Sequence, residues 1–210
     1  MDEDRQLRLT RRRLLQLGIA LPLPAVLAAC DGATQDGGGA ASATTAPQAL
    51  PPTPACDDGD DPTPAQTEGP YFTPNSPERA SLLEAGLGGD RLTVAGTVLA
   101  TDCRPLRRAL LDFWQADADG RYDIQGYRLR GHQFTDADGR FTLETVVPGQ
   151  YPGRTRHIHV KVQAPNGPVL TTQLYFPGEA ANASDGIFRE ELLLTMNGTR
   201  QASFTFVLQG

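Results

Sequence analysis

Short runs that alternate between apolar and polar residues dominate the chain from about residue 67 onward. A period of two is typical of strands with one buried face, and little of the 3.6-residue helical period is present. The runs predicted as strands are 91–99, 109–115, 140–146, 156–163, 169–176, 188–194 and 202–208. Strands at this spacing favour an all-β fold, an antiparallel β-sandwich. Only residues 81–87 are expected to form a short helix.

Two copies of the sequence Asp-Ala-Asp-Gly, at 117–120 and 136–139, separate predicted strands. Asp and Gly are typical of tight turns, because Asp can hydrogen-bond the local backbone and Gly accepts a positive φ. Both copies also resemble part of a calcium loop. Neither has the Glu at the twelfth position that an EF-hand requires. We therefore predict turns at both places.

The run RHIHVKV at 156–162 is the most informative of the predicted strands. Because side chains alternate between the two faces of a strand, Ile158, Val160 and Val162 point together into a core. His157 and His159 then share the opposite face, one pleat apart. At this spacing both imidazoles can reach one metal ion.

The residues alone leave the identity of that metal open. Imidazole ligands by themselves would suit zinc or copper. A cupin-like site would need a later histidine, and His159 is the last of the three in the chain. Tyr122 and Tyr151 each follow a Gly-containing turn, and two phenolates added to two imidazoles would favour a hard trivalent ion such as Fe(III). A tyrosine beside a turn can equally be a packed aromatic residue.

Residues 1–29 have the pattern of an export signal. A twin-arginine sequence, TRRRLL at 10–15, leads into an apolar run that is short for a membrane-spanning helix and contains two prolines. The run ends in Leu-Ala-Ala-Cys, which resembles a bacterial lipobox and predicts cleavage before Cys30 and lipid attachment to its sulfur. An uncleaved membrane anchor is the alternative. We therefore expect an exported protein held by lipid in the cell envelope, on the extracytoplasmic face.

Residues 30–66 are rich in Gly, Ala, Thr, Pro and Asp and have few large apolar side chains. Such a segment cannot bury enough surface to order itself, so we predict a disordered linker before a folded domain at 67–210. Cys56 and Cys103 remain as an even pair in an oxidising compartment, which favours a disulfide; two free thiols are the alternative. A bridge would close a loop of about 47 residues and contribute roughly 4 kcal/mol.

The net charge of the chain is −6, and no basic stripe is evident in the sequence. This charge pattern argues against nucleic acid as a partner.

A series of motifs in preserved order and spacing resembles the intradiol ring-cleavage dioxygenases, the family of catechol 1,2- and protocatechuate 3,4-dioxygenases. The motifs are TEGPYF at 67–72, DFWQADADGRY at 112–122, RGHQFTD at 130–136, PGQYPGR at 148–154, HIH at 157–159 and LTTQLYF at 170–176. Any one of them is a modest signal, and together they cover most of residues 67–210. The resemblance implies a β-sandwich of the intradiol dioxygenase type, with little helix.

The resemblance also implies a non-haem Fe(III) centre and the residues that form it. The expected iron ligands are Tyr122, Tyr151, His157 and His159, with Tyr151 and His159 as the axial pair. Arg154 is expected to offset negative charge in the site, Gln173 to lie beside the substrate ring, and Tyr151 to take a proton from the substrate. The segment expected to line the substrate pocket comprises Gly69, Pro70 and Tyr71.

The reaction implied is oxygen-dependent cleavage of a catechol-type ring between its two hydroxylated carbons, giving a muconate-type diacid. The small aromatic diol and O₂ are then the partners, and no organic cofactor is needed. Exported members of the family also carry cysteines at the positions of Cys56 and Cys103. The oligomeric state stays open.

Two features keep other interpretations open. Arg156 is expected near the metal face or its rim, where it would favour an anionic substrate, or at a solvated strand end. The stretch from 138 to 151 also resembles transthyretin-like and carboxypeptidase-regulatory-type modules. A non-catalytic binding module on an exported protein is therefore the alternative function, although it gives no reason for Arg154, His157, His159 and Gln173 to occur together.

Overall fold

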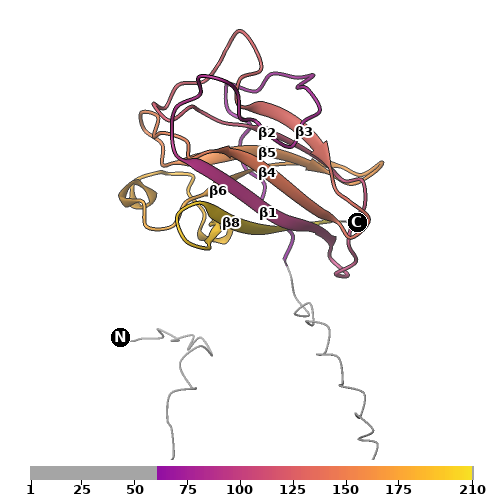
Figure 1. Cartoon of the computed structure of the whole chain (residues 1–210). Coiled ribbons are helices and arrows are strands. Elements are labelled where there is room, and N and C mark those ends of the chain that lie inside the picture. Colours follow the sequence, from indigo (N-terminus) through magenta and orange to yellow (C-terminus); the bar gives the residue numbers. More distant parts are fainter. Residues whose placement is uncertain (1–60, 210) are drawn as a thin grey trace, which may run out of the picture. The chain divides into compact units, whose positions relative to one another are not determined.

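The computed structural model describes residues 61–209, which form two four-stranded β-sheets stacked as layers (Figure 1). The predicted β-sandwich with little helix is confirmed: among these residues the only helical turns are two short 3₁₀ segments, η2 (Ala180–Ala183) and η3 (Glu190–Leu192). The predicted signal peptide 1–29, Cys30 and Cys56 lie outside the described residues. Export, lipid attachment and the Cys56–Cys103 disulfide therefore stay predictions.

The first sheet carries the two histidines of the HIH motif. Its strands lie in the order β3-β2-β5-β6, and each neighbouring pair is antiparallel. The strands are β3 (Arg130–Phe134), β2 (Leu110–Trp114), β5 (His157–Gln163) and β6 (Val169–Tyr175). The β5 strand is thus central, with β2 on one side and β6 on the other.

The second sheet corrects one part of the sequence prediction. Its strands lie in the order β4-β1-β8-β7, namely β4 (Arg140–Val146), β1 (Arg91–Ala100), β8 (Gln201–Leu208) and β7 (Thr195–Met196). The β1 and β8 strands run parallel, whereas the other two pairs are antiparallel. The sandwich is therefore mixed at this one pair. Strands so far apart in sequence need no tight hairpin between them, so either direction is open to them.

The core lies between the sheets and follows the predicted alternation. Leu111 and Phe113 of β2, and Ile158, Val160 and Val162 of β5, are fully buried. They meet apolar side chains of the second sheet, namely Val94, Val98, Leu143 and Phe206. Because the core takes alternate residues, the remaining side chains of β2 and β5 are left for the outer face of the first sheet.

Residues 77–82 connect the two sheets instead of forming the predicted short helix at 81–87. The backbone of this segment pairs first with His132 on β3 and then with Glu144 on β4. Leu82 is fully buried against the core. Pairing with two sheet edges satisfies backbone groups that a helix would have used internally, which is why tertiary contacts prevail over the local pattern.

One predicted strand is wrong, and two observed strands were not predicted. The run 188–194 forms the η3 turn and a single bridge between Leu193 and Tyr175, not a strand. The β3 and β7 strands were not predicted, because neither has a clear alternation.

Residues 61–66, assigned to the linker, hydrogen-bond to the sandwich: Thr63 N–H donates to Val207 O, and Gln66 N–H to Thr171 O.

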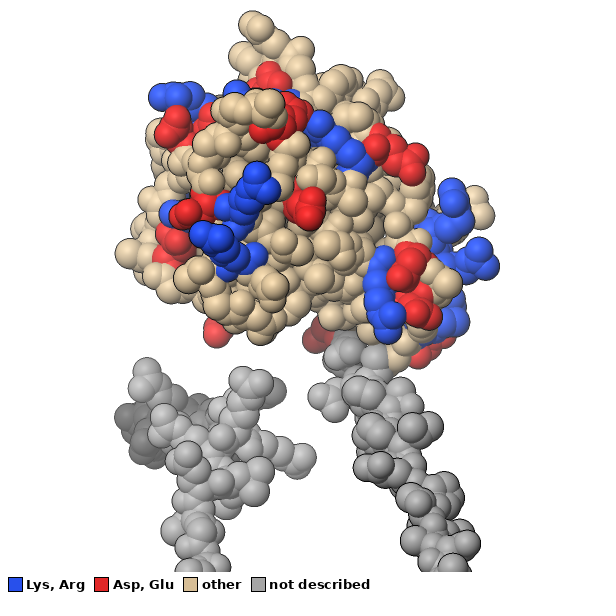
Figure 2. All heavy atoms as spheres, viewed as in Figure 1, with Lys and Arg blue, Asp and Glu red and all other residues tan. Residues whose placement is uncertain are grey.

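Charged side chains of both signs are interspersed on the face shown in Figure 2. Several arginines pair with a carboxylate two residues away, as Arg121 does with Asp119 and Arg140 with Asp138. No helix within residues 61–209 has the length and apolar character needed to cross a membrane.

Candidate metal centre

His157 and His159 lie side by side on the outer face of the first sheet, as the alternation of β5 predicts. Loops cover this face, so the two side chains are only 4% and 3% exposed. Their Nε2 atoms lie 3.1 Å apart. The two imidazoles therefore direct one nitrogen each toward a common point beneath the covering loops.

Burial keeps both imidazoles neutral at pH 7. It lowers the pKa of His157 to about 4 and that of His159 well below its ordinary value. His157 Nδ1 lies 2.6 Å from the carbonyl oxygen of Thr155, to which a protonated Nδ1 donates. In that tautomer Nε2 of His157 has a free lone pair, which is the form that a metal ion requires.

Tyr122 brings a third donor atom to the same point. Its phenol oxygen lies 3.2 Å from Nε2 of His157. Burial raises the pKa of the Tyr122 phenol above its ordinary value, although the nearby charge of Arg154 lowers it in part. The phenol is therefore protonated at pH 7 unless a cation binds beside it.

The turn at 117–121 sets the position of Tyr122. The carboxylate oxygen Oδ1 of Asp117 accepts hydrogen bonds from the backbone N–H groups of Asp119 and Arg121, both at 2.9 Å. The turn at 136–140 repeats this arrangement around Asp136. The carboxylates are thus used in building the turns, as the sequence predicted.

The turn bearing Tyr151 packs directly on the turn before Tyr122. Gly149 N–H donates to Asp117 O at 2.7 Å. A Cβ atom on Gly120 would lie 2.1 Å from Gln150 O, and one on Gly149 would lie 2.4 Å from Gly120 N. Neither position has room for a side chain, so the two glycines fix the Tyr151 turn against the Tyr122 turn.

The aromatic rings of three tyrosines meet above the histidines. The ring centroids of Tyr122 and Tyr151 lie 6.1 Å apart at 89°. Tyr71 stacks on Tyr122 at 4.4 Å and meets Tyr151 edge-on at 5.8 Å. The structure thus brings the Tyr122 oxygen to the two imidazoles and packs the Tyr151 ring against Tyr122, with Tyr71 packed against both tyrosines.

Arg154 and Gln173 form one hydrogen-bonded network beside the histidines. Nη2 of Arg154 donates to Gln173 Oε1 at 2.6 Å, and Gln173 Nε2 donates to Thr67 O at 3.0 Å. Nε of Arg154 pairs with Asp185 at 2.9 Å. Burial alone would raise the pKa of Asp185, but hydrogen bonds from Thr155 N–H, Ile187 N–H and Arg154 lower it.

Strand register places Trp114 and Tyr175, which the sequence did not single out, next to the metal centre. Trp114, His159 and Gln173 form one row across β2, β5 and β6, and Tyr175 lies opposite His157. The Trp114 ring stacks on the imidazole of His159 at 4.7 Å and 8°. The alternation of β2 could have indicated Trp114, because Leu111 and Phe113 occupy its core face. Asp185 lies in a loop that gives no periodic signal.

The segment expected to line the substrate pocket lies over His159. A Cβ on Gly69 would be 3.5 Å from Cε1 of that imidazole, so only a residue without a side chain leaves this space open. Pro70 and Tyr71 follow in a turn. Lys161 of β5 contacts both ends of the segment 68–72: it pairs with Glu68 at 2.5 Å, and its Nζ lies 3.6 Å from the Phe72 ring centroid.

Arg156 was expected either near the metal face or at a solvated strand end, and its guanidinium pairs with Glu179 instead of contacting the metal donors. The residue precedes His157, so its side chain takes the other side of the strand, where Nε lies 3.0 Å from Glu179 Oε1. His132 is a polar residue of β3 whose Nδ1 contacts Ser76, so it lies outside the site. The Tyr127 hydroxyl donates to Pro74 O.

The donor set fits a metal ion only if the tyrosines take part. Within residues 61–209, no group of three or more His, Cys, Asp or Glu side chains could hold a metal ion. The two Nε2 atoms and the Tyr122 oxygen nevertheless converge, and two neutral imidazoles with phenolate oxygens suit a hard trivalent cation better than zinc or copper.

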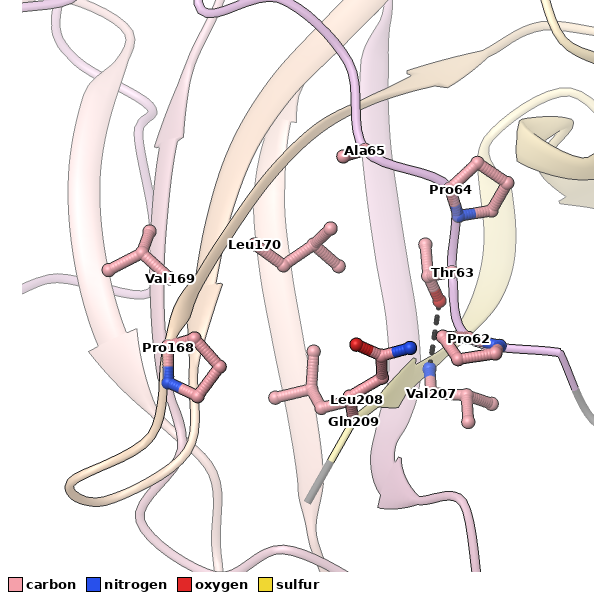
Figure 3. Close-up of a pocket in the computed structure, with 10 residues that line it drawn as sticks. All are labelled: Pro62, Thr63, Pro64, Ala65, Pro168, Val169, Leu170, Val207, Leu208 and Gln209. Carbon is pink, nitrogen blue, oxygen red and sulfur yellow. Dashed lines mark hydrogen bonds between the residues drawn. The ribbon is translucent and has the colours of Figure 1, made fainter.

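One cavity lies beside this centre, and a second lies away from it. One of about 570 Å³ opens beside Tyr151 and Arg154 and is bordered by Ala181 and Ser184. A second cavity, of about 430 Å³, lies between residues 62–65 and the ends of β6 and β8 (Figure 3). At this cavity Thr63 Oγ1 accepts a hydrogen bond from Val207 N–H. It lies beside Val169, at the opposite end of β6 from Tyr175, so it does not belong to the metal centre.

Comparison with known proteins connects this arrangement to one family. The family model described as "Dioxygenase" matches residues 67–210. The 6-chlorohydroxyquinol 1,2-dioxygenase of Cupriavidus pinatubonensis is 30% identical over 165 residues, which cover 67% of this chain and 60% of that protein. The chain thus spans less than two thirds of that relative.

Solved structures point to the same family as the family model and the relative. The dioxygenase domain of a dioxygenase–carbohydrate-binding protein fusion from Streptomyces sp. SirexAA-E is 58% identical, with a TM-score of 0.68 over 71% of this chain and 99% of that one. An intradiol ring-cleavage dioxygenase from Tetranychus urticae is 25% identical, with a TM-score of 0.66 over 71% of this chain and 95% of that one. On the family match and these likenesses, the chain belongs to the intradiol ring-cleavage dioxygenase family.

Proposed function

We propose that this protein is a non-haem Fe(III) dioxygenase. It cleaves a catechol-type ring with O₂ between the two hydroxylated carbons and releases a muconate-type diacid. The observation that carries the proposal is the convergence of three donor atoms, Nε2 of the buried His157, Nε2 of the buried His159 and the oxygen of Tyr122, with the Tyr151 ring packed against Tyr122. Membership of a family of ring-cleaving dioxygenases supports the same assignment.

The iron would be held by Tyr122, Tyr151, His157 and His159. Bound ferric iron supplies Lewis acidity toward a catecholate and accepts electron density from its ring, which makes the ring reactive toward O₂. The neutral, buried imidazoles bind without first losing a proton. Both phenols must ionise, and their negative charge matches a trivalent ion.

The protein's own residues prepare the diol for this chemistry. A catechol must lose two protons to bind as a dianion: the Tyr151 oxygen would accept one of them as a general base, and the other would pass to water. The guanidinium of Arg154 stabilises negative charge on the diol oxygens from a fixed position, because Gln173 holds it. Packing of Tyr71 on Tyr122 helps to exclude water from the reacting face.

The substrate is a small aromatic diol that enters beside Tyr151 and contacts Gly69, Pro70 and Tyr71. A flat ring suits this position, because aromatic side chains line it and Gly69 leaves space above His159. Arg156 lies on the opposite face and pairs with Glu179, so it gives no preference for a carboxylated diol.

Colour and oxygen consumption test the proposal together. Protein purified after iron-replete expression should hold about one iron per chain and absorb visible light, because phenolate transfers charge to ferric iron. Oxygen uptake across a panel of catechol, hydroxyquinol, chlorocatechol and protocatechuate should match the formation of ring-opened diacids. A colourless, iron-free protein that consumes no oxygen would instead favour the non-catalytic binding module.

We further propose that the enzyme acts outside the cytoplasm, anchored by lipid on Cys30 and braced by a Cys56–Cys103 disulfide. The export pattern of residues 1–29 and the even cysteine pair support this location. Mass spectrometry of the mature N-terminus would detect a lipidated Cys30. Peptide mapping without reductant should recover Cys56 linked to Cys103, and an unprocessed N-terminus or two free thiols would contradict the proposal.

A further inference from the structure

Asp185 belongs to none of the motifs that point to the metal centre, yet its carboxylate contacts that centre's surroundings at several points. Oδ2 accepts from Arg154 Nε and from Thr155 N–H, both at 2.9 Å. Oδ1 accepts from Ile187 N–H at 3.1 Å. The side chain of Asp185 is 2% exposed, so these contacts face little competition from water.

The contacts of Asp185 and Gln173 together fix the orientation of the Arg154 guanidinium. Asp185 holds the Nε edge, and Gln173 Oε1 accepts from Nη2 at 2.6 Å. Gln173 is itself held by Thr67 O. A planar guanidinium held at two of its nitrogens cannot turn about its bond to the side chain. Nη1 makes no hydrogen bond to any residue within 61–209 and stays available to a ligand.

The loop that carries Asp185 is tied to the residues just before β5. Thr155 Oγ1 donates to Asn182 Oδ1 at 2.6 Å, and Asn182 Nδ2 donates to Phe176 O at 2.9 Å. The loop that carries the carboxylate is therefore held by hydrogen bonds of its own. Because the carboxylate does not depend on Arg154 for its position, it can determine the orientation of the guanidinium. A partly buried charge pair of this kind is stronger than an exposed one.

We infer that Asp185 is a positioning residue for ring cleavage, acting through Arg154. Its carboxylate holds the guanidinium where positive charge is needed beside the diol oxygens. The inference rests on the proposed function, because Arg154 can assist only if the diol binds at this centre. Removing the carboxylate should leave iron and fold in place while loosening Arg154, and misplacement of a catalytic charge can lower turnover by up to about 100-fold.

A double-mutant cycle tests the route through Arg154. The variants are Asp185→Asn, Arg154→Gln and their combination, each assayed for iron content, visible absorption, thermal unfolding and kcat/KM with catechol. An Asn oxygen in the place of Oδ2 can still accept from Thr155 N–H and Arg154 Nε, so the substitution removes the negative charge beside Arg154. Its amide nitrogen no longer accepts from Ile187 N–H, and thermal unfolding reports that loss. Glu179→Gln is the matched control: it removes a partly buried carboxylate paired with Arg156 on the other face of the strand, and keeps an acceptor for Gln150.

We expect Asp185→Asn to lower kcat/KM by about tenfold or more in the wild-type background, and by less than about threefold when Arg154 is already Gln. Glu179→Gln should change kcat/KM by less than about threefold. Equal losses in both backgrounds, or no loss in the wild type, would overturn the inference. If Asp185→Asn does not fold, Asp185→Glu, which displaces the carboxylate relative to Arg154 by one methylene, takes its place in the same cycle. Failure of the proposed function is distinct, because the wild type itself would then lack iron and oxygen uptake.

Discussion

Gly120 and Gly149 lie in such close contact that a Cβ atom on Gly149 would be 2.4 Å from Gly120 N. The two residues belong to different loops, one preceding Tyr122 and the other preceding Tyr151. Their contact therefore joins the two turns that present the phenols of the proposed iron centre. The position of one tyrosine relative to the other depends on the absence of two side chains.

Substituting Gly149 by Ala should separate the two tyrosines. Gly149 does not have a positive φ, so the effect comes from the clash with Ala118 O and Gly120 N. We expect loss of most iron and visible absorption, and a decrease of about 1–3 kcal/mol in the free energy of unfolding. Gly88→Ala is the control, because no atom lies within 4 Å of the added methyl. Full iron content in Gly149→Ala would show that the contact does not position the phenols.

His157→Ala should abolish iron retention, because it removes one of two imidazoles whose Nε2 atoms lie 3.1 Å apart. The matched control is His132→Ala, which removes the third histidine of the chain. His132 lies on β3, where its ring contacts Ser76. Iron per chain, measured by atomic emission on protein purified in parallel, distinguishes the two variants. Stoichiometric iron in His157→Ala would exclude this residue as a ligand.

Tyr151→Phe should keep some iron but lose turnover. The remaining three ligands still hold the ion, whereas the oxygen that accepts a substrate proton is gone. Loss of a general base costs about 10²–10⁴-fold in rate. The measurement is kcat from oxygen uptake, normalised to bound iron, and turnover like that of the wild type would remove Tyr151 from this role.

Iron binding should release a proton from Tyr122. Burial raises the pKa of this phenol, so it is protonated at pH 7 in the metal-free protein and must ionise to bind. The buried imidazoles are already neutral and release none. Calorimetry of ferric iron binding in two buffers of different ionisation enthalpy counts the protons. Tyr122→Phe should release about one fewer, and an unchanged count would contradict phenolate ligation by this residue.

The stability of the metal-free protein should decrease as pH falls from about 6.5 to 4. Burial lowers the pKa of His157 to about 4 in the folded state, while an unfolded histidine titrates near 6.5. Between these values the unfolded chain binds the extra proton, so His157 alone lowers the free energy of unfolding by about 1.4 kcal/mol per pH unit. His159, whose pKa burial also lowers, adds to this fall. Urea denaturation across this range measures the slope. In His157→Gln the slope of the unfolding free energy against pH should be smaller by about 1.4 kcal/mol per pH unit. Equal slopes in the variant and the wild type would show that the imidazole is not buried in its neutral form.

Much of the fold could be predicted from local pattern alone. Alternation identified most of the long strands and placed His157 and His159 on one face, because that face follows directly from the period of a strand. The Asp-x-Asp-Gly turns were also predictable, since each carboxylate bonds backbone groups only two and four residues away. The tyrosines were indicated by their motifs, because no periodicity distinguishes a ligand from a packed ring.

What the sequence could not determine depends on contacts between distant segments. The parallel pairing of β1 with β8, the strand-like segment at 77–82 and the position of Asp185 all arise from residues tens of positions apart. For Arg156, alternation with His157 is a local pattern, but its partner Glu179 lies 23 residues away and is decided by the tertiary structure. Local sequence determined which side chains share a face, because that is set by backbone geometry. Only the tertiary structure decided which loops cover that face, because their packing follows from long-range contacts that leave no period in the sequence.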